Sequence, residues 1–243
     1  MTRIRDESYV LLTAAYNEQE CIEETIKSVV AQVIRPKAWV IVSDGSTDRT
    51  DEIVQRYALR YPFIRFIRRE KDSHCGFASK VLALRMGIQR LTLEATQFIG
   101  HLDADVSLGP CYFRDLLMKF KQDPKLGIAG GSILEQTRSG LWRSRAGNTT
   151  TSTPGAIQMF RRKCYEDIGE LVPIEYGGED WYAEIRARMC GWRVRSFSEL
   201  PVHHHRQSGT RDNLLRYCYR AGYMDFAFGS HPLFELAKVL KRL

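Results

Sequence analysis

Short apolar runs of strand length alternate with segments of helical periodicity, and this alternation constrains the fold more than any other feature of the chain. The run Tyr9–Ala15 is followed by apolar residues at helical spacing from Ile22 onward. The run Trp39–Ser43 is followed by a second segment of the same kind. Strand and helix in alternation predict a parallel sheet with helices on both faces. We therefore expect an α/β protein with a Rossmann-like, mostly parallel central sheet flanked by helices.

The pattern continues with less regularity toward the C-terminus. The stretch Gln136–Pro154 is rich in Ser, Thr, Gly and Arg, and we predict a mobile loop there. Two helical segments are expected after the histidines at 203–205. Further strands are expected at 63–67, 97–102, 127–131, 157–160 and 192–197, and helices after Gly76 and at 110–121, 161–168 and 179–190.

The length and the composition favour one large domain. The 243 residues are 44% hydrophobic and 27% charged, which is close to ordinary globular usage and can supply one sizeable core. We expect a single domain over 1–230, followed by an amphipathic helix over 231–243.

The net charge limits the classes of binding partner that fit the chain, and the cysteine pattern indicates its cellular compartment. The formal net charge of +7 favours an anionic partner, such as nucleotide phosphates, nucleic acid or an anionic lipid surface, without choosing among them. The six cysteines form no C-x-x-C pair, which is typical of a reducing compartment. The first eight residues predict no signal peptide. We expect a cytoplasmic protein.

Two aspartates follow the predicted strand at 97–102 directly. Asp103 and Asp105 can leave the sheet edge together and hold Mg²⁺ or Mn²⁺, which prefer one or two carboxylates plus phosphate oxygens. A diphosphate ligand is therefore implied. The alternative is a plain turn, since Asp is common after strands.

Asp44 stands at the end of an earlier predicted strand, in the run Asp44-Gly45-Ser46-Thr47-Asp48. Ligand crevices of parallel sheets lie beyond the carboxyl ends of their strands, where a carboxylate can accept hydrogen bonds from a base or a ribose. The alternative for this run is capping of the following helix by its hydroxyls or by Asp48.

Four segments in this order resemble the signatures of family-two inverting glycosyltransferases of the GT-A type. They span roughly the first four-fifths of the chain, and the set is more specific than any member. The resemblance implies metal-assisted transfer of a sugar from a nucleotide diphosphate to an acceptor hydroxyl, with a donor half at about 1–105 and an acceptor half at about 106–210. The segments are Thr13-Ala14-Ala15-Tyr16-Asn17-Glu18, Ser43-Asp44-Gly45-Ser46-Thr47-Asp48, Leu102-Asp103-Ala104-Asp105 and Gly178-Glu179-Asp180-Trp181.

The same resemblance implies roles for single residues. An acceptor hydroxyl needs a positioned proton acceptor, while a cation stabilises the departing diphosphate. Without the resemblance, Asp180 would be interpreted as an acidic residue in the first turn of a helix. The implied roles are nucleotide contact for Ala15 and Glu18, base contact for Asp44, ribose contact for Asp103, metal binding for Asp105 and general-base catalysis for Asp180.

Basic side chains and histidines complete the candidate site. The resemblance implies that Lys80 lies in a loop near the donor, where it could approach a phosphate, although a surface lysine fits the sequence equally well. The histidines His203 to His205 cannot all face one point in an extended segment. We name His203 and His205 as candidate metal ligands, and Arg206 as the residue that neutralises charge on the donor.

The substrates are less constrained than the class. We favour a uridine-diphosphate sugar as donor and an acceptor in polysaccharide or glycolipid assembly, suggested by the resemblance alone. No Q-x-x-R-W follows the Glu179-Asp180 pair, so we expect one sugar to be added per encounter.

Two other readings remain open at this point. The sequence Asp103-Ala104-Asp105-Val106-Ser107 also fits the loose pattern of aspartate-nucleophile phosphatases, which place it on their first strand. A basic nucleic-acid-binding module would explain the net charge, but no recognised binding motif accompanies the arginines. We therefore expect no nucleic-acid partner.

The segment Pro232–Leu243 carries leucines on one stripe, flanked by basic residues. It could lie on an anionic membrane and bring the site to a lipid-linked acceptor, on the inner face of the cell membrane. The alternative is a last helix packed on the domain.

Overall fold

The computed structural model describes residues 8–70, 76, 78–94, 96–137, 139–145, 147–175 and 177–206, together with 219, 222–224, 226 and 228–231. The helix predicted over 231–243 lies outside these residues except for His231, and most of the two helical segments expected after residue 206 also lie outside them. No helix within the described part of the chain is both long and apolar enough to cross a membrane.

The first half of the chain forms a parallel sheet with the strand order β3-β2-β1-β4. Its strands carry apolar side chains on both faces, as expected when helices cover both sides. The strands are β1 (Tyr9–Ala15), β2 (Ala38–Asp44), β3 (Ile64–Arg69) and β4 (Phe98–Leu102), and the helices between them are α1 (Ile22–Val30), α2 (Thr50–Arg60) and α3 (Ala78–Ile88).

The second half continues the same sheet in the order β8-β6-β9-β5, with β7 paired to β6. Here β6 and β9 run parallel, whereas the pairs β4–β8, β6–β8, β6–β7 and β5–β9 are antiparallel. The elements are β5 (Val106–Leu108), α4 (Tyr112–Gln122), β6 (Leu126–Gln136), β7 (Trp142–Ser144), β8 (Ile157–Arg161), α5 (Arg162–Ile168), α6 (Glu179–Met189) and β9 (Arg193–His204).

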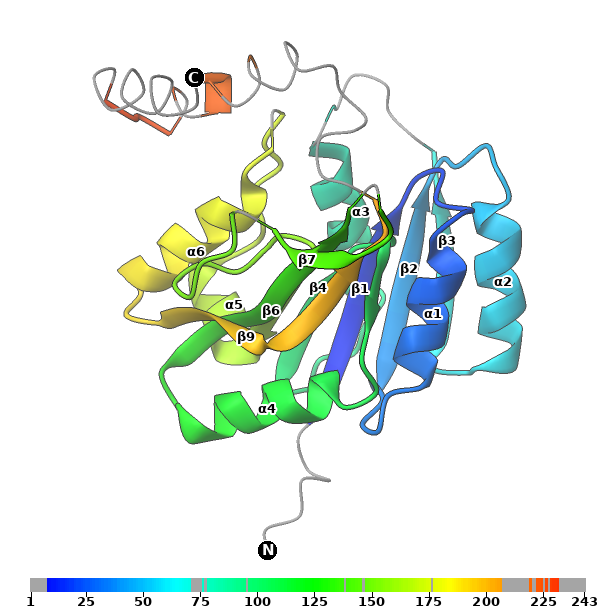
Figure 1. The fold of residues 1–243 in the computed structure, drawn as a ribbon, viewed down its shortest axis with the longest axis horizontal. Coiled ribbons are helices and arrows are strands. Elements are labelled where there is room, and N and C mark those ends of the chain that lie inside the picture. Colours follow the sequence, from blue (N-terminus) through cyan, green and yellow to red (C-terminus); the bar gives the residue numbers. More distant parts are fainter. Residues whose placement is uncertain are drawn as a thin grey trace, which may run out of the picture.

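Two apolar layers hold the sheet. Helices α1, α2 and α4 pack with one face, including Tyr9 and Leu11 of β1. Helices α3, α5 and α6 pack with the other, including Val10 and Leu12. In Figure 1, α1 and α2 lie at the β3 end of the sheet and α5 and α6 at the opposite end. The parallel strands are thus packed on both faces, and the loops at their carboxyl ends lie along one edge of the sheet.

The α/β class predicted from the sequence is confirmed, although parallel pairing dominates only in the first half. Two strands are longer than predicted, since β6 extends to Gln136 and β9 extends through His204. The stretch predicted as one mobile loop contains the strand β7, which pairs with the extension of β6. Both differences arise from pairings that apolar periodicity does not report.

Candidate active site

The site lies where the parallel strands end. Ala15 is the last residue of β1, Asp44 is the last residue of β2, and Asp103 directly follows β4. Adjacent parallel strands end on the same edge, so these residues of three distant segments come together. Asp44 and Asp103 therefore lie at the carboxyl edge of the sheet, as the sequence predicted.

The loops after β1 and β2 are joined by hydrogen bonds. Asn17 adopts a left-handed conformation with φ of 53°, its backbone N–H donates to Ser46 Oγ at 3.1 Å, and its side-chain Oδ1 accepts the N–H of Thr47 at 2.8 Å. Asp48 accepts the N–H and hydroxyl of Thr50 at 3.0 and 2.6 Å. The N-cap residue of α2 is Arg49, whose side chain makes no capping hydrogen bond, so Asp48 holds the start of the helix from one residue before the cap.

Asp44 is buried beside a basic and a hydroxyl side chain. The Ser79 hydroxyl donates to its Oδ2 at 2.5 Å, and the Arg69 guanidinium pairs with its Oδ1. Arg69 lies opposite Asp44 in the β2–β3 register and also donates to Ser79 Oγ at 3.0 Å. These contacts orient the carboxylate at the strand end.

Lys80 joins the β4 edge to the start of α6. Its Nζ lies 2.7 Å from Asp103 Oδ1 and 3.8 Å from Glu179 Oε1. Burial by itself would lower the pKa of Lys80, but the neighbouring acidic charges outweigh burial and raise it. Burial raises the pKa of both Asp103 and Glu179. Lys80 therefore remains a cation at neutral pH.

Asp105 lies between a histidine and an arginine. Its Oδ1 is 3.4 Å from His204 Nε2, and its Oδ2 is 3.8 Å from Arg206 Nη1. Burial would raise the pKa of Asp105, but His204 and Arg206 lower it overall. Arg206 also binds Glu18 through two N–H···O bonds of 2.9 and 2.5 Å. Glu18, which is predicted to contact the nucleotide, and Asp105, which is predicted to bind the metal, thus both lie beside the Arg206 guanidinium.

The three histidines at 203–205, two of which are predicted metal ligands, face different neighbours in the structure. β9 is extended through His204, so alternate side chains point to opposite faces. The rings of His203 and His205 lie against Trp142, with centroids 4.7 and 5.7 Å away, and His205 Nε2 is 2.8 Å from Ser107 Oγ. The structure directs the ring of His204 at the Asp105 carboxylate, whereas His205 donates its backbone N–H to the Asp105 carbonyl at 2.9 Å. Alternation along an extended segment predicts that His204 faces the opposite side from His203 and His205. Which of the two sides faces Asp105 is decided only by the pairing of β9 with its neighbours.

The donor atoms around Asp105 fit a hard divalent cation. His204 directs Nε2 at Asp105, while its buried Nδ1 has no hydrogen-bond partner among the described residues and lies 3.7 Å from the carboxylate of Glu135. A metal-bound histidine ordinarily directs its second nitrogen at a carboxylate in this way. No cluster of three or more potential metal ligands is preformed among the described residues. Mg²⁺ and Mn²⁺ need only one or two carboxylates when phosphate oxygens complete the shell.

Asp180 stands at the start of α6. The helix follows Gly178, which has φ of 94°, and Asp180 Oδ1 accepts the N–H of Trp181 at 2.8 Å. Its other oxygen lies against Gly155 of the β7–β8 loop, where a Cβ atom would be 2.4 Å from it. The backbone of Gly155 therefore lies directly against the Asp180 carboxylate, a contact that the sequence did not predict.

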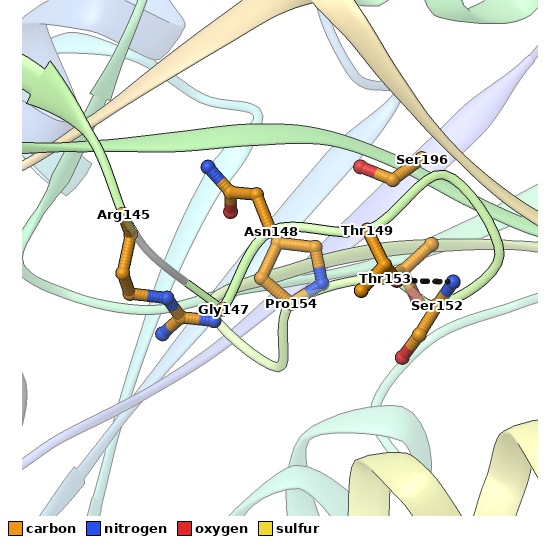
Figure 2. A pocket seen from close by; sticks show the side chains of 8 residues that line it. All are labelled: Arg145, Gly147, Asn148, Thr149, Ser152, Thr153, Pro154 and Ser196. Atoms are coloured by element: carbon orange, nitrogen blue, oxygen red, sulfur yellow. Dashed lines mark hydrogen bonds between the residues drawn. The ribbon is translucent and has the colours of Figure 1, made fainter. Parts of the chain in front are cut away.

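A polar pocket lies in the β7–β8 loop, close to this approach. Ser152 donates its N–H to Thr149 Oγ1 at 3.2 Å within the loop (Figure 2). The Asn148 side chain donates to the carbonyl of Ile133 at 2.8 Å and so ties the loop to β6. The pocket is lined by Arg145, Gly147, Asn148, Thr149, Ser152, Thr153, Pro154 and Ser196.

Comparison with known proteins agrees with this geometry. The sheet, with acidic residues at its carboxyl edge, is of the GT-A type found in nucleotide-sugar transferases. The profile described as "Glycosyl transferase family 2" matches residues 11–175. The chain belongs to this family.

A curated relative and two solved structures illustrate the likeness. The chain is 31% identical over 209 residues to poly-beta-1,6-N-acetyl-D-glucosamine synthase of Staphylococcus aureus (strain COL), covering 78% of this chain and 48% of that protein. It spans about half the length of the curated relatives it matches.

The solved structures are of lower identity and show the fold. The mannosyltransferase PcManGT from Pyrobaculum calidifontis, in complex with GDP-Man and Mn²⁺, matches with a TM-score of 0.65 at 20% identity, over 83% of this chain and 58% of the other. S. aureus TarS 1–349 in complex with UDP-GlcNAc matches with a TM-score of 0.62 at 17% identity, over 83% and 59%.

Proposed function

We propose that this chain catalyses an inverting, metal-assisted transfer of one sugar from a nucleotide diphosphate to an acceptor hydroxyl. The observation that carries the proposal is the meeting of Asp103 and the start of α6 at Lys80, which puts donor-side and base-side carboxylates in one site. The family and the GT-A fold support the same reaction class. Asp103 follows the fourth strand rather than the first, which disfavours the phosphatase alternative.

The donor would lie along the strand ends. Ala15 and Glu18 would line the nucleotide, Asp44 would contact the base and Asp103 the ribose. Lys80 and Arg206 carry positive charge beside these positions and can neutralise phosphate oxygens. Asp105 and His204 would hold Mg²⁺ or Mn²⁺. Such a cation, when bound, stabilises the negative charge of the departing diphosphate.

Asp180 would act as the general base. As the acceptor oxygen forms its bond to the anomeric carbon, the bond from that carbon to the diphosphate breaks, and the acceptor proton passes to Asp180. A single displacement of this kind inverts the anomeric configuration. Gly155 leaves room for the carboxylate at this place.

The relatives suggest the substrates to try first. One relative is a synthase of a poly-β-1,6-N-acetylglucosamine, and one structural neighbour is in complex with UDP-GlcNAc. We therefore propose a UDP-sugar donor, with UDP-N-acetylglucosamine first, and a saccharide or lipid-linked acceptor. Peripheral contact with an anionic membrane, on its cytoplasmic face, would bring a lipid-linked acceptor to the site.

The experiment is a donor screen with matched controls. Sugar nucleotides of uridine, guanosine and thymidine are incubated with the protein, Mn²⁺ and N-acetylglucosamine oligosaccharides, and released nucleotide and extended product are measured. Product from at least one donor, with no phosphate released from a simple phosphate ester, is expected. Binding of labelled nucleic acid without binding of any sugar nucleotide would instead support the basic-module alternative.

A further inference from the structure

Glu184 is a fully buried carboxylate one helical turn after Asp180 on α6, and it takes no part in the proposed chemistry. Its Oε1 accepts the backbone N–H of Thr153 at 2.6 Å and the Thr153 hydroxyl at 2.7 Å. Its Oε2 lies 3.2 Å from Arg188 Nη2. A buried carboxylate is costly without such partners. Because two of these bonds come from one residue of the β7–β8 loop, they fix that loop to α6.

The segment that Glu184 holds, Thr153–Ala156, also contacts the donor side of the site. The carbonyl of Gly155 accepts a hydrogen bond from Lys80 Nζ at 3.4 Å. The carbonyl of Ala156 accepts the N–H of Asp103 at 2.9 Å. The segment therefore runs from a buried residue of α6 to the Lys80 side chain of α3 and the Asp103 backbone at the end of β4.

Between these anchors, the segment passes directly against Asp180. A Cβ atom on Gly155 would lie 2.4 Å from Asp180 Oδ2, 3.0 Å from Cγ and 3.2 Å from Cβ. Rotation of the Asp180 side chain could relieve the closest of these contacts, but only by moving the carboxylate itself. The place of the carboxylate is thus set by the backbone of Gly155.

We propose that Glu184 is a positioning residue, which acts through Thr153–Ala156 to fix the Asp180 carboxylate relative to Lys80 and Asp103. The proposal rests on the proposed function, in which Asp180 is the general base. Loosening the segment moves the base, whereas Lys80 and Asp103 stay paired with each other and Asp44 and Asp105 keep their own contacts. The rate of transfer therefore falls much more than donor binding. A displacement near 1 Å can reduce a rate by about 100-fold.

Two glycines of the same loop provide a matched test. Gly155→Ala places a methyl group against Asp180, whereas Gly147→Ala meets nothing closer than an Arg145 atom at 4.0 Å. Neither glycine has a positive φ, so backbone strain does not separate them. With UDP-N-acetylglucosamine as donor, Gly155→Ala is expected to lower kcat by about 10- to 100-fold. The affinity for UDP with Mn²⁺ stays within about twofold of wild type, and Gly147→Ala matches wild type in both.

A second pair of variants tests the hydrogen bonding between Thr153 and Glu184 directly. This pair also tests the positioning role of Glu184 if Gly155→Ala does not fold. Thr153→Val removes the hydroxyl that donates a hydrogen bond to Glu184, whereas Thr153→Ser keeps this hydroxyl. We expect kcat to fall in Thr153→Val and to be restored in Thr153→Ser, with UDP affinity unchanged in both. Circular dichroism at the assay temperature establishes that each variant is folded.

The outcomes separate this proposal from the one on which it rests. Equal kcat in Gly155→Ala and Gly147→Ala, or in Thr153→Val and Thr153→Ser, overturns the positioning role of Glu184. Equal losses of kcat and UDP affinity in Gly155→Ala and Thr153→Val also overturn it, because they indicate general support of the site. Full transfer by Asp180→Asn defeats the assignment of the base instead.

Discussion

Asp44 and Asp103 on the parallel side of the site are held differently from Asp180 on the α6 side. On the parallel side, Asp44 is paired with Arg69. Asp103 is paired with Lys80. On the α6 side, Asp180 accepts a backbone hydrogen bond and, among the described residues, forms no ion pair. An ion pair fixes a carboxylate in one orientation, which suits ligand binding, whereas a carboxylate outside such a pair keeps an oxygen for an incoming proton. The difference supports the proposed binding roles of Asp44 and Asp103 and the proposed role of Asp180 as general base.

The largest effect is expected on the α6 side. Asp180→Asn keeps the shape and removes the basic oxygen, so kcat should fall by about 100-fold or more, the scale expected when a general base is lost. Calorimetric titration with UDP and Mn²⁺ should give an affinity close to that of wild type. If affinity and kcat fall together, Asp180 has a structural role and the contrast between the two sides is lost.

The second prediction concerns Asp105, which is proposed to bind the metal on the donor side of the site. Asp105→Ala removes the carboxylate that faces His204 and Arg206, and metal-dependent affinity for UDP should fall by about 100-fold, since even the supporting partners of metal ligands contribute 10- to 100-fold. The measurement is UDP titration in Mn²⁺ and in chelator. For Asp105→Ala, the two titrations should coincide. Unchanged affinity in Mn²⁺ would contradict the metal assignment.

The smallest of the expected effects concerns the β4–β8 seam between the two halves. His101 of β4 is buried beside Phe160 and Tyr165, and burial lowers its pKa to about 3. In the unfolded chain it takes up a proton near its ordinary pKa of 6.5, so the stability from this residue is present above that pH and is lost as the pH falls toward 3. Between about pH 7.5 and pH 5, the free energy of unfolding should fall by about 2 kcal/mol more in wild type than in His101→Leu. Urea unfolding at both pH values measures this; parallel losses in the two proteins would show that His101 is not held neutral.

The parallel half could be predicted from sequence because its signals are local. Tyr9–Ala15 was predicted with its observed bounds, since a strand covered on both faces is a continuous apolar run. The carboxylates Asp44 and Asp103 were placed at one edge because strand ends are visible in the same runs. The second half depends on antiparallel pairings between distant segments, so β7 was not predicted and β9 was predicted too short.

The same reason limits the prediction of the site. The sequence could not decide which of His203, His204 and His205 faces Asp105, because the side that an extended residue faces depends on its paired strands, here β5 and β6. The contacts of Gly155 with Asp180 and of Thr153 with Glu184 join positions far apart in sequence and follow no motif. Chemistry-bearing residues at strand ends were therefore recognisable, and the residues that position them were not.

The anomeric configuration of the product tests the central claim most directly. With an α-linked donor such as UDP-N-acetylglucosamine, a single displacement assisted by Asp180 must give a β-linked product. The configuration is measured by proton NMR on the first product formed, before any equilibration. The account predicts a β linkage in wild type and no change of configuration in the residual product of Asp180→Asn. An α-linked product would contradict it, because retention requires a different arrangement of reacting groups from the one proposed at this edge of the sheet.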